Sequence, residues 1–549
     1  MFEELLETCK KLKGSQTSLR EIREDILQLV PNGCTAQDLK NFLSASKDEL
    51  DHVAVLLAAY AATLKISKDA EGRQDRIDQD NNLDDTLRDV ADVISSLILP
   101  IRSCDSLDED ETDYSALQRK GELGLLALDA LTKTPSKPAP LQLPHPVLLR
   151  VTAFTNAADP WTTAESRSLS HSLLEAQLQQ LGDSQTRAFI AEDILTSFLR
   201  PLFSKSRPAA ITASGRKAEF VEPSRYDGAS RESPETKPWK YAHRYAVTVF
   251  AWAVERADST LLQAHWPLFT PVLLTLIDEP GPSAFKVRAL GILRAFWARC
   301  PAGLMRDTGL GEVFEQAVFP AVLYLPSLTP EDESLDILGA AYPVLIEMAG
   351  LAVDRPLVTA GAITAQEQQT QKSTHQITEA QRRLLDKIIR EGIMIGYHHA
   401  KEHVRLVGLF CETLVCIING MGILAVKHLK DFIPMLSEVM IDPFGTKHPP
   451  TLSSATNLLQ AILRNCWPRI QHYCNEVIKM IMLCWLNIED EESLPPNSPI
   501  ANDLKSRLTQ TANMLSAIMK AAQIDFRQRV DPLIEKEPQL KELFGGMNS

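Results

Sequence analysis

The sequence repeats one local pattern, an apolar helical segment, a proline-containing turn and a second helical segment. Apolar residues recur at every third or fourth position on both sides of the turn, which is the period of an amphipathic helix. A single pair of such helices cannot bury its apolar faces, whereas stacked pairs can, so the pattern predicts a solenoid. The copies occupy residues 265–300, 312–350, 383–420 and 427–467, with a fifth from residue 474 onward.

The composition favours the same fold. Leucine, alanine and isoleucine carry most of the 44% hydrophobic content, and aromatic residues make up only 6%, a balance typical of helices. The first copy fits the HEAT pattern best, because Trp266-Pro267 stands early in its first helix, Asp278 at the turn and Val287-Arg288 early in its second. The period is irregular, at about 50 residues. We therefore expect an all-α, HEAT/armadillo-like helical-repeat solenoid with irregular repeats.

Polar, proline-rich stretches divide the chain. The stretch at 204–240 is rich in proline, serine and charge, and compact domains rarely contain a structureless loop of that length, which indicates disorder. The predicted segments are an N-terminal helical region (1–131), a helical segment after a proline-rich linker (132–203), a disordered insert (204–236), HEAT-like repeats (237–355), a polar linker (356–380) and C-terminal HEAT-like repeats (381–549).

The net charge indicates which partners to expect, and the cysteine content indicates the redox compartment. The net charge is −14, which repels phosphate backbones and argues against direct nucleic-acid binding. The nine cysteines form no C-x-x-C pair, as expected of buried thiols in a reducing compartment. The N-terminus carries no signal-peptide pattern. The most apolar stretch, 403–426, is interrupted by charged and glycine residues, so we expect no membrane span and a location in cytoplasm and nucleus.

One short motif suggests catalysis. His399, Glu402 and His403 form the H-x-x-E-H pattern of inverted zinc peptidases. Zinc would need a third ligand and an open position for water, and no residue downstream is marked as that ligand. The same face continues into the apolar stripe of the repeat, and the motif falls at the connector between two paired helices. A zinc peptidase is therefore a remote alternative to a polar connector.

Other chemical motifs are absent from the sequence. There is no G-x-S-x-G nucleophile elbow, no phosphate-binding loop and no dinucleotide fingerprint. We expect no enzyme activity and no cofactor. Ser106 is followed by Asp108 and Glu109, which makes it a candidate phosphorylation site for an acidophilic kinase.

Three stretches resemble a known family. GILAVKHLKDFIPMLSEVMIDPFGTKHPPTLSSATNLLQAILRNCWPRI (422–470) is similar to the signature region of the Tel-Two-interacting protein family, in its second Tti subunit. FPAVLYLPSLTPEDESLDILGAAYPVL (319–345) and KPWKYA (237–242) are similar to two further stretches of that family, in the same order. The resemblance covers roughly residues 237–470.

The resemblance implies a non-catalytic scaffold subunit of the Triple-T (TTT) co-chaperone complex. Members of the family bind a larger HEAT-repeat Tti subunit and, with the Tel-Two subunit, work with the ninety-kilodalton heat-shock chaperone and its RuvB-like adaptor complex. The clients are phosphatidylinositol-3-kinase-related protein kinases, whose maturation and stability the complex supports. An importin-like helical-repeat transport adaptor is the alternative that the fold class leaves open.

The apolar surplus of residues 404–486 indicates either central helices of a stack or a surface covered by another chain. We predict the main partner interface in the C-terminal repeats, while a core role for the same residues stays open. The candidate partner-binding residues are Lys427, His428, Lys430, Phe432, Pro443, Trp467 and Trp485.

Overall fold

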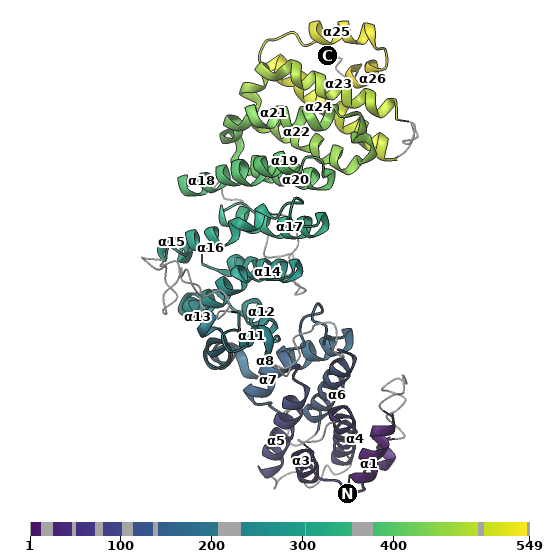
Figure 1. The fold of residues 1–549 in the computed structure, drawn as a ribbon, viewed down its shortest axis with the longest axis vertical. Helices are drawn as coiled ribbons and strands as arrows, with labels where there is room; N and C mark the ends of the chain where they lie inside the picture. The colour runs from purple at the N-terminus through teal and green to yellow at the C-terminus, as the bar shows by residue number, and fades with distance from the viewer. Residues whose placement is uncertain are drawn as a thin grey trace. The chain divides into compact units, whose positions relative to one another are not determined.

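The computed structural model describes residues 2–12, 26–46, 51–71, 81–101, 114–134, 141–206, 232–301, 303–353, 377–491 and 499–545 (Figure 1). Throughout these ranges the regular elements are helices and no strand occurs, which confirms the all-α prediction. The chain divides into two compact units. The first comprises Met1–Thr275 and Arg299–Thr308, and the second comprises Leu276–Ala298 and Gly309–Ser549. The segment boundaries predicted from composition stay a prediction.

The first unit is built from irregular helices. Its longer elements are α1 (Glu3–Leu12), α3 (Ala36–Ala45), α4 (His52–Glu71), α5 (Asn81–Ile98), α6 (Tyr114–Thr132), α7 (His145–Thr152), α8 (Ala164–Ala188), η3 (Phe189–Leu199) and α12 (Ala246–Arg256). Helix α6 packs between α4 and α5, and α8 packs against α6. Helix α3 begins with a capping box, in which Thr35 and Asp38 each bond the other's backbone N–H.

An aromatic clasp joins two short helices of this unit, α9 (Arg200–Phe203) and α11 (Pro238–Tyr241). Trp239 stacks on Phe203 with 4.9 Å between ring centroids, and its indole N–H donates to Ser206 Oγ at 3.1 Å. Glu232 accepts hydrogen bonds from Lys237, Lys240 and Tyr241. Burial alone would raise the pKa of Glu232, but these donors lower it to about 2. The clasp therefore fixes the residues on either side of the stretch 207–231.

The five predicted helix pairs are all present, in the predicted order. They are α13 (Ser259–Asp278) with α14 (Ser283–Arg299), α16 (Leu310–Val318) with α17 (Glu331–Met348), the run α18 (Glu379–Lys387), η7 (Ile388–Met394) and α19 (Ile395–Ala400) with α20 (Val404–Met421), α21 (Leu429–Ile441) with α22 (Pro449–Ile470), and α23 (Cys474–Glu489) with α24 (Pro499–Ala521). Short elements connect these helices, namely α15 (Leu304–Asp307), η5 (Phe319–Leu323), η8 (Gly422–His428), η9 (Pro443–Lys447) and η10 (Gln471–Tyr473). Helices α25 (Arg527–Lys536) and α26 (Leu540–Gly545) follow.

In the second unit the pairs stack helix on equivalent helix (Figure 1). Helix α20 packs between α17 and α22, α22 packs in turn on α24, and α21 packs on α23. Because α20 and α22 are each covered on two sides, most of their circumference is buried, and stacking accounts for most of the apolar surplus of residues 404–486. These contacts make the C-terminal part of the chain a helical-repeat solenoid of the HEAT class.

Polar side chains hold neighbouring repeats in register. Arg294 of α14 pairs with Glu347 of α17 at 2.6 Å, where both side chains are largely buried. Farther along, Asn465 of α22 donates to Asn419 of α20 at 3.0 Å. Such pairs tie equivalent positions of successive second helices, so slipping one repeat against the next would break them.

The turn of the first pair is filled by a lysine that sequence analysis did not single out. The Lys286 ammonium donates to the carbonyl oxygens of Ile277 and, at 3.2 Å, of Glu279, and so satisfies the C-terminal end of α13. Burial lowers the pKa of Lys286 more than the neighbouring Asp278 and Glu279 raise it.

Two Trp-Pro dipeptides kink their helices at the same relative position. In α13 the non-helical residue is His265, two positions before Pro267, and in α22 it is Cys466, two positions before Pro468. A proline inside a helix removes one backbone hydrogen bond and clashes with the preceding turn. The sequence therefore marks both kinks.

Two helical stretches are long and apolar enough to cross a membrane by length and composition, Ser259–Asp278 and Val404–Ile441. About half of each window, 56% and 50%, is buried inside the protein. Core helices of proteins without a membrane span meet the same criterion, so this property alone assigns no membrane contact.

We predict that Trp239→Ala destabilises the first unit by about 3–5 kcal/mol, because it removes a fully buried aromatic ring and leaves a cavity beside Phe203. Trp467→Ala, which removes a mostly exposed ring, should change stability by less than about 0.5 kcal/mol. Thermal unfolding of both variants measures the difference. Equal shifts in the two midpoints would show that the clasp contributes nothing.

Candidate protein-binding surface

The H-x-x-E-H motif does not form a helical metal site. Helix α19 ends at Ala400, Lys401 and Glu402 form a turn, and α20 begins at Val404. His399 therefore lies in the last turn of α19, whereas His403 precedes α20, so the two histidines do not lie one turn apart on a single helix. His403 instead contacts Glu331, with 3.1 Å between Nδ1 and the carboxylate. The motif is a connector between paired helices, as its position within the repeat predicted.

Within the described ranges no three His, Cys, Asp or Glu side chains are grouped so as to hold a metal ion. The cysteines of the described residues are free, and most are buried. Burial raises the pKa of the Cys411 and Cys484 thiols to about 12, so both are protonated and unreactive at neutral pH. These findings do not test the prediction that the chain lacks enzyme activity.

The seven candidate partner-binding residues divide by burial. Lys427, Lys430, Pro443 and Trp467 are exposed. His428, Phe432 and Trp485 are buried in the repeat cores and are not available to a partner in this structure. For these three the structure supports the core role that sequence analysis left open. Partner binding by the four exposed residues stays a prediction.

His428 and Lys427 share one acceptor, Asp386 of α18 in the preceding repeat. His428 Nε2 lies 2.9 Å from one carboxylate oxygen, and Lys427 pairs with the other. Burial alone would raise the pKa of Asp386, but the hydrogen bonds from Lys427 and His428 outweigh it and hold the pKa below its usual range. Sequence analysis missed Asp386, because it lies on an earlier helix with no local motif. Together the three side chains fasten η8 to α18.

The protonation state of His428 follows from this geometry. Nε2 must carry the proton that is donated to Asp386, and the other ring nitrogen, Nδ1, is buried with no hydrogen-bond partner among the described residues. Protonating Nδ1 would place a charge beside Lys427 in a site closed to solvent. Burial accordingly lowers the pKa of His428 more than Asp386 raises it.

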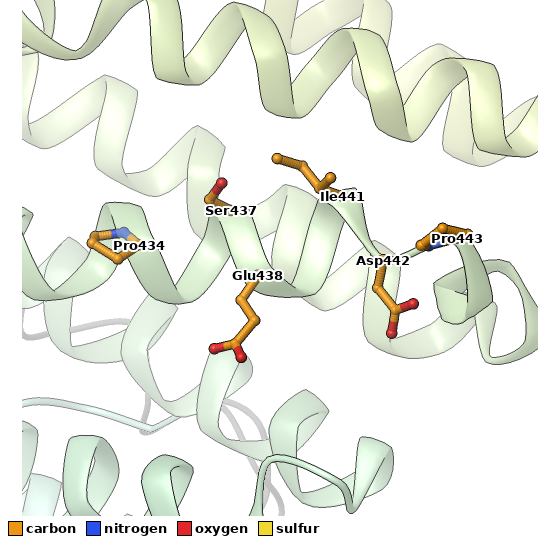
Figure 2. Close-up of a pocket in the computed structure, with 6 residues that line it drawn as sticks. All are labelled: Pro434, Ser437, Glu438, Ile441, Asp442 and Pro443. Atoms are coloured by element: carbon orange, nitrogen blue, oxygen red, sulfur yellow. The ribbon is translucent and has the colours of Figure 1, made fainter.

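A shallow groove runs along the outer face of α21 (Figure 2). It holds about 570 Å³ and is lined by Pro434, Ser437, Glu438, Ile441, Asp442 and Pro443. Glu438 already accepts hydrogen bonds from Tyr397 at 2.8 Å and Lys401 at 2.7 Å, which lower its pKa. Asp442 caps η9 by accepting from the Phe444 N–H at 2.9 Å. Both carboxylates thus serve the contacts of this chain itself.

Exposed hydrophobic side chains stand at both ends of the helix pair formed by α21 and α22. Phe444 is 76% exposed at the turn that joins the two helices. Trp467, Ile423 and Leu424 are 56%, 54% and 38% exposed at the opposite end, where the chain passes from one repeat to the next. Sequence analysis selected Trp467 but missed Phe444, which lies inside the stretch that carries the family resemblance. Exposed aromatic rings near apolar neighbours are typical of protein interfaces.

Three sequence predictions fall wholly or mostly outside the described residues. Ser106 lies in the stretch 102–113, most of the predicted disordered insert lies in 207–231, and most of the predicted polar linker lies in 354–376. None of these predictions is tested.

The fold defines a class, that of all-α helical-repeat proteins of the HEAT type. The sequence model of the Tti2 family matches residues 147–447, which is more than half of the chain, and the chain belongs to this family. Membership supports a general role as a TTT co-chaperone subunit.

No protein of the curated set matches the sequence significantly. Among solved structures, importin beta in a polyethylene glycol condition is similar, with 13% sequence identity and a TM-score of 0.32 over 97% of this chain and 68% of that one. A similarity at this level says nothing about function.

We predict that stability falls on mild acidification because of His428. The unfolded chain binds a proton near pH 6.5, whereas folded His428 resists protonation, so its contribution is complete above pH 6.5 and is lost as the pH falls below it, by at most about 1.4 kcal/mol per pH unit. His428→Gln should therefore lose less stability than the wild type when the pH falls from 7.5 to 5.5. The measurement is the thermal unfolding midpoint of each protein at the two pH values. Asp386 titrates far below this window.

Phe432→Leu is the matched control for this measurement, because Phe432 is buried next to His428, with 5.7 Å between ring centroids, and its replacement removes no titrating group. The difference in unfolding midpoint between Phe432→Leu and the wild type should stay constant over the pH range. If the difference for His428→Gln is equally constant, His428 is not the group that makes stability depend on pH.

Proposed function

We propose that this protein is a non-catalytic scaffold subunit of a TTT co-chaperone complex. In this role it binds a larger HEAT-repeat Tti subunit directly and assembles with the Tel-Two subunit. The observation that carries the proposal is the Tti2 family match across residues 147–447, which extends over the two units and into the C-terminal repeats. The stacked repeats support it, because such arrays present a continuous surface to other proteins, and the described residues hold no group of metal-ligating side chains.

The assembled complex would act on phosphatidylinositol-3-kinase-related protein kinases. Together with the heat-shock chaperone and its RuvB-like adaptor complex, which it would reach indirectly, it would support the maturation and stability of these kinases. We propose that the chain works in the cytoplasm and nucleus, where the predominance of free cysteines suits a reducing environment. Nucleic acid and membrane are not among the proposed partners, because the net charge of −14 disfavours both.

Affinity purification of the tagged chain from its own cells, at moderate salt, tests the assembly. We expect two large helical-repeat proteins in near-stoichiometric amounts and the kinases in smaller amounts, because a scaffold stays bound while its clients pass through. Mass spectrometry of the eluate measures both. A chain recovered alone, or one released by a small GTPase as a transport adaptor would be, contradicts the proposal.

His399→Ala separates the scaffold from the remote peptidase alternative. Because His399 is an exposed connector residue, its loss should leave the recovered partners unchanged. A peptidase would instead copurify with stoichiometric zinc and lose that zinc in the variant. Metal analysis of the wild-type and variant eluates distinguishes the two outcomes.

A further inference from the structure

The end of α22 presents a tryptophan to solvent. Pro468 disrupts the helix two residues earlier, at Cys466, whose φ of −108° and ψ of 16° are not helical. Cys466 itself is buried, whereas Trp467 is 56% exposed. Burying a ring of this size would stabilise the fold, so its exposure at a kinked helix end leaves a large apolar surface available to a partner.

Two further apolar side chains lie at the same end of the stacked helices. The hydrogen bond from Asn465 to Asn419, at 3.0 Å, sets the C-terminal ends of α22 and α20 side by side. Ile423 and Leu424 follow directly after α20, in η8, and η8 packs against α22. We call this surface the Trp467 edge; it comprises Ile423, Leu424, Lys430, Arg464, Trp467 and Arg469.

The Trp467 edge carries cations that the rest of the chain does not neutralise. Arg464, Arg469 and Lys430 are exposed, and none forms an ion pair within the described part of the chain. Arg464 donates from Nε only to Gln460 O of its own helix, at 3.2 Å. Lys427 next to them is already paired with Asp386. Other cations of the repeats, such as Arg294 and Lys401, are used in contacts of the chain itself.

The acidic residues at this end have a separate role. Asp431 and Glu476 lie in the first turns of α21 and α23, the two helices that begin here. Unpaired backbone N–H groups at a helix N-terminus favour negative charge. Asp431 and Glu476 reduce the positive field of the Trp467 edge. Arg464 and Arg469, which flank Trp467 in the sequence, still have no carboxylate partner among the described residues.

From this arrangement we propose that the Trp467 edge binds an acidic amphipathic segment of a protein partner. The apolar residues of that segment would cover Trp467, Ile423 and Leu424, and its carboxylates would pair with Arg464 and Arg469. Guanidinium groups bind carboxylates through two parallel hydrogen bonds, and tryptophan and arginine dominate the binding energy of most interfaces.

A protein segment fits this edge better than an anionic polymer or lipid surface. Charges interact over about 8 Å at physiological ionic strength. A short segment therefore experiences the local arginines, whereas a nucleic acid or membrane also meets the acidic remainder of a chain with net charge −14. The exposed ring and isoleucine also require an apolar counterpart, which phosphate groups do not supply.

The inference rests on the proposed function only in that the chain acts by binding proteins. It adds the place and the chemistry of one contact. The two can therefore fail separately. A wild-type chain that recovers no partner contradicts the proposed function, whereas partner recovery that is indifferent to the Trp467 edge contradicts only the inference.

Site-specific cross-linking is the first test. The full chain, carrying the photoreactive amino acid p-benzoylphenylalanine at position 467, is irradiated in its own cells, and the linked peptide is sequenced by mass spectrometry. We expect a single protein segment in which aspartate and glutamate outnumber lysine and arginine and alternate with apolar residues at helical spacing. A linked segment that is basic, or the absence of any link, would overturn the proposal.

Charge reversal is the second test. Arg464→Glu combined with Arg469→Glu should lower recovery of the cross-linked partner at least about tenfold, and Trp467→Ala should do so by a similar factor. Phe444→Ala is the matched control, because it removes an aromatic ring that is even more exposed, at the other end of α22, about 27 Å away along the helix. It should leave recovery unchanged.

The remaining outcomes also decide the question. Thermal unfolding midpoints of all variants should match the wild type, because every altered side chain is exposed. Loss of the partner with Phe444→Ala but not with the edge variants would place the contact at the wrong end of the helix pair. Binding of the purified chain to phosphatidylserine vesicles, abolished by the arginine reversal, would show a membrane site instead.

Discussion

The structure depends on one constraint, that helices which are apolar over most of their circumference must be covered on more than one side. Helix α20 buries residues in every turn, among them Leu406, Phe410, Leu414 and Ile418. Its own partner helix covers only part of that surface, so the preceding and following repeats must cover the rest. Cooperative stacking follows directly, because no repeat in the middle of the array is complete without two neighbours.

This constraint explains how far the sequence predicts the fold. The period of three to four and the proline turns identify all five helix pairs, and the Trp-Pro dipeptides mark both kinks. Sequence cannot locate contacts between repeats by the same means. Asp386 bonds His428 from a position 42 residues away, a separation at which no local pattern connects two residues. The order of the repeats is therefore readable from sequence, and the contacts between them are not.

The same limit applies to the candidate surface. Residue type made Phe432, Trp467 and Trp485 candidates for partner binding, yet only Trp467 is exposed. Phe432 follows Leu429 by three positions and precedes Leu436 by four, so it belongs to the buried stripe of α21. Helical phase would have excluded it. For the H-x-x-E-H motif, spacing alone misled, because a spacing of four has chemical meaning only inside an unbroken helix, and α19 ends within the motif.

The distribution of paired charges gives the surface its specificity. Several cations of the C-terminal repeats hold neighbouring repeats in register, as Lys401 does with Glu438 and Arg405 with Asp332. Exposed pairs of this kind add little stability, but each occupies a charge that a partner could otherwise bind. A second protein can pair only with the cations that are left over, and Arg464 and Arg469 are two of them, where the chain passes from one repeat to the next. In a helical-repeat protein, the charges that the packing of the repeats does not use are therefore the ones that can select a partner.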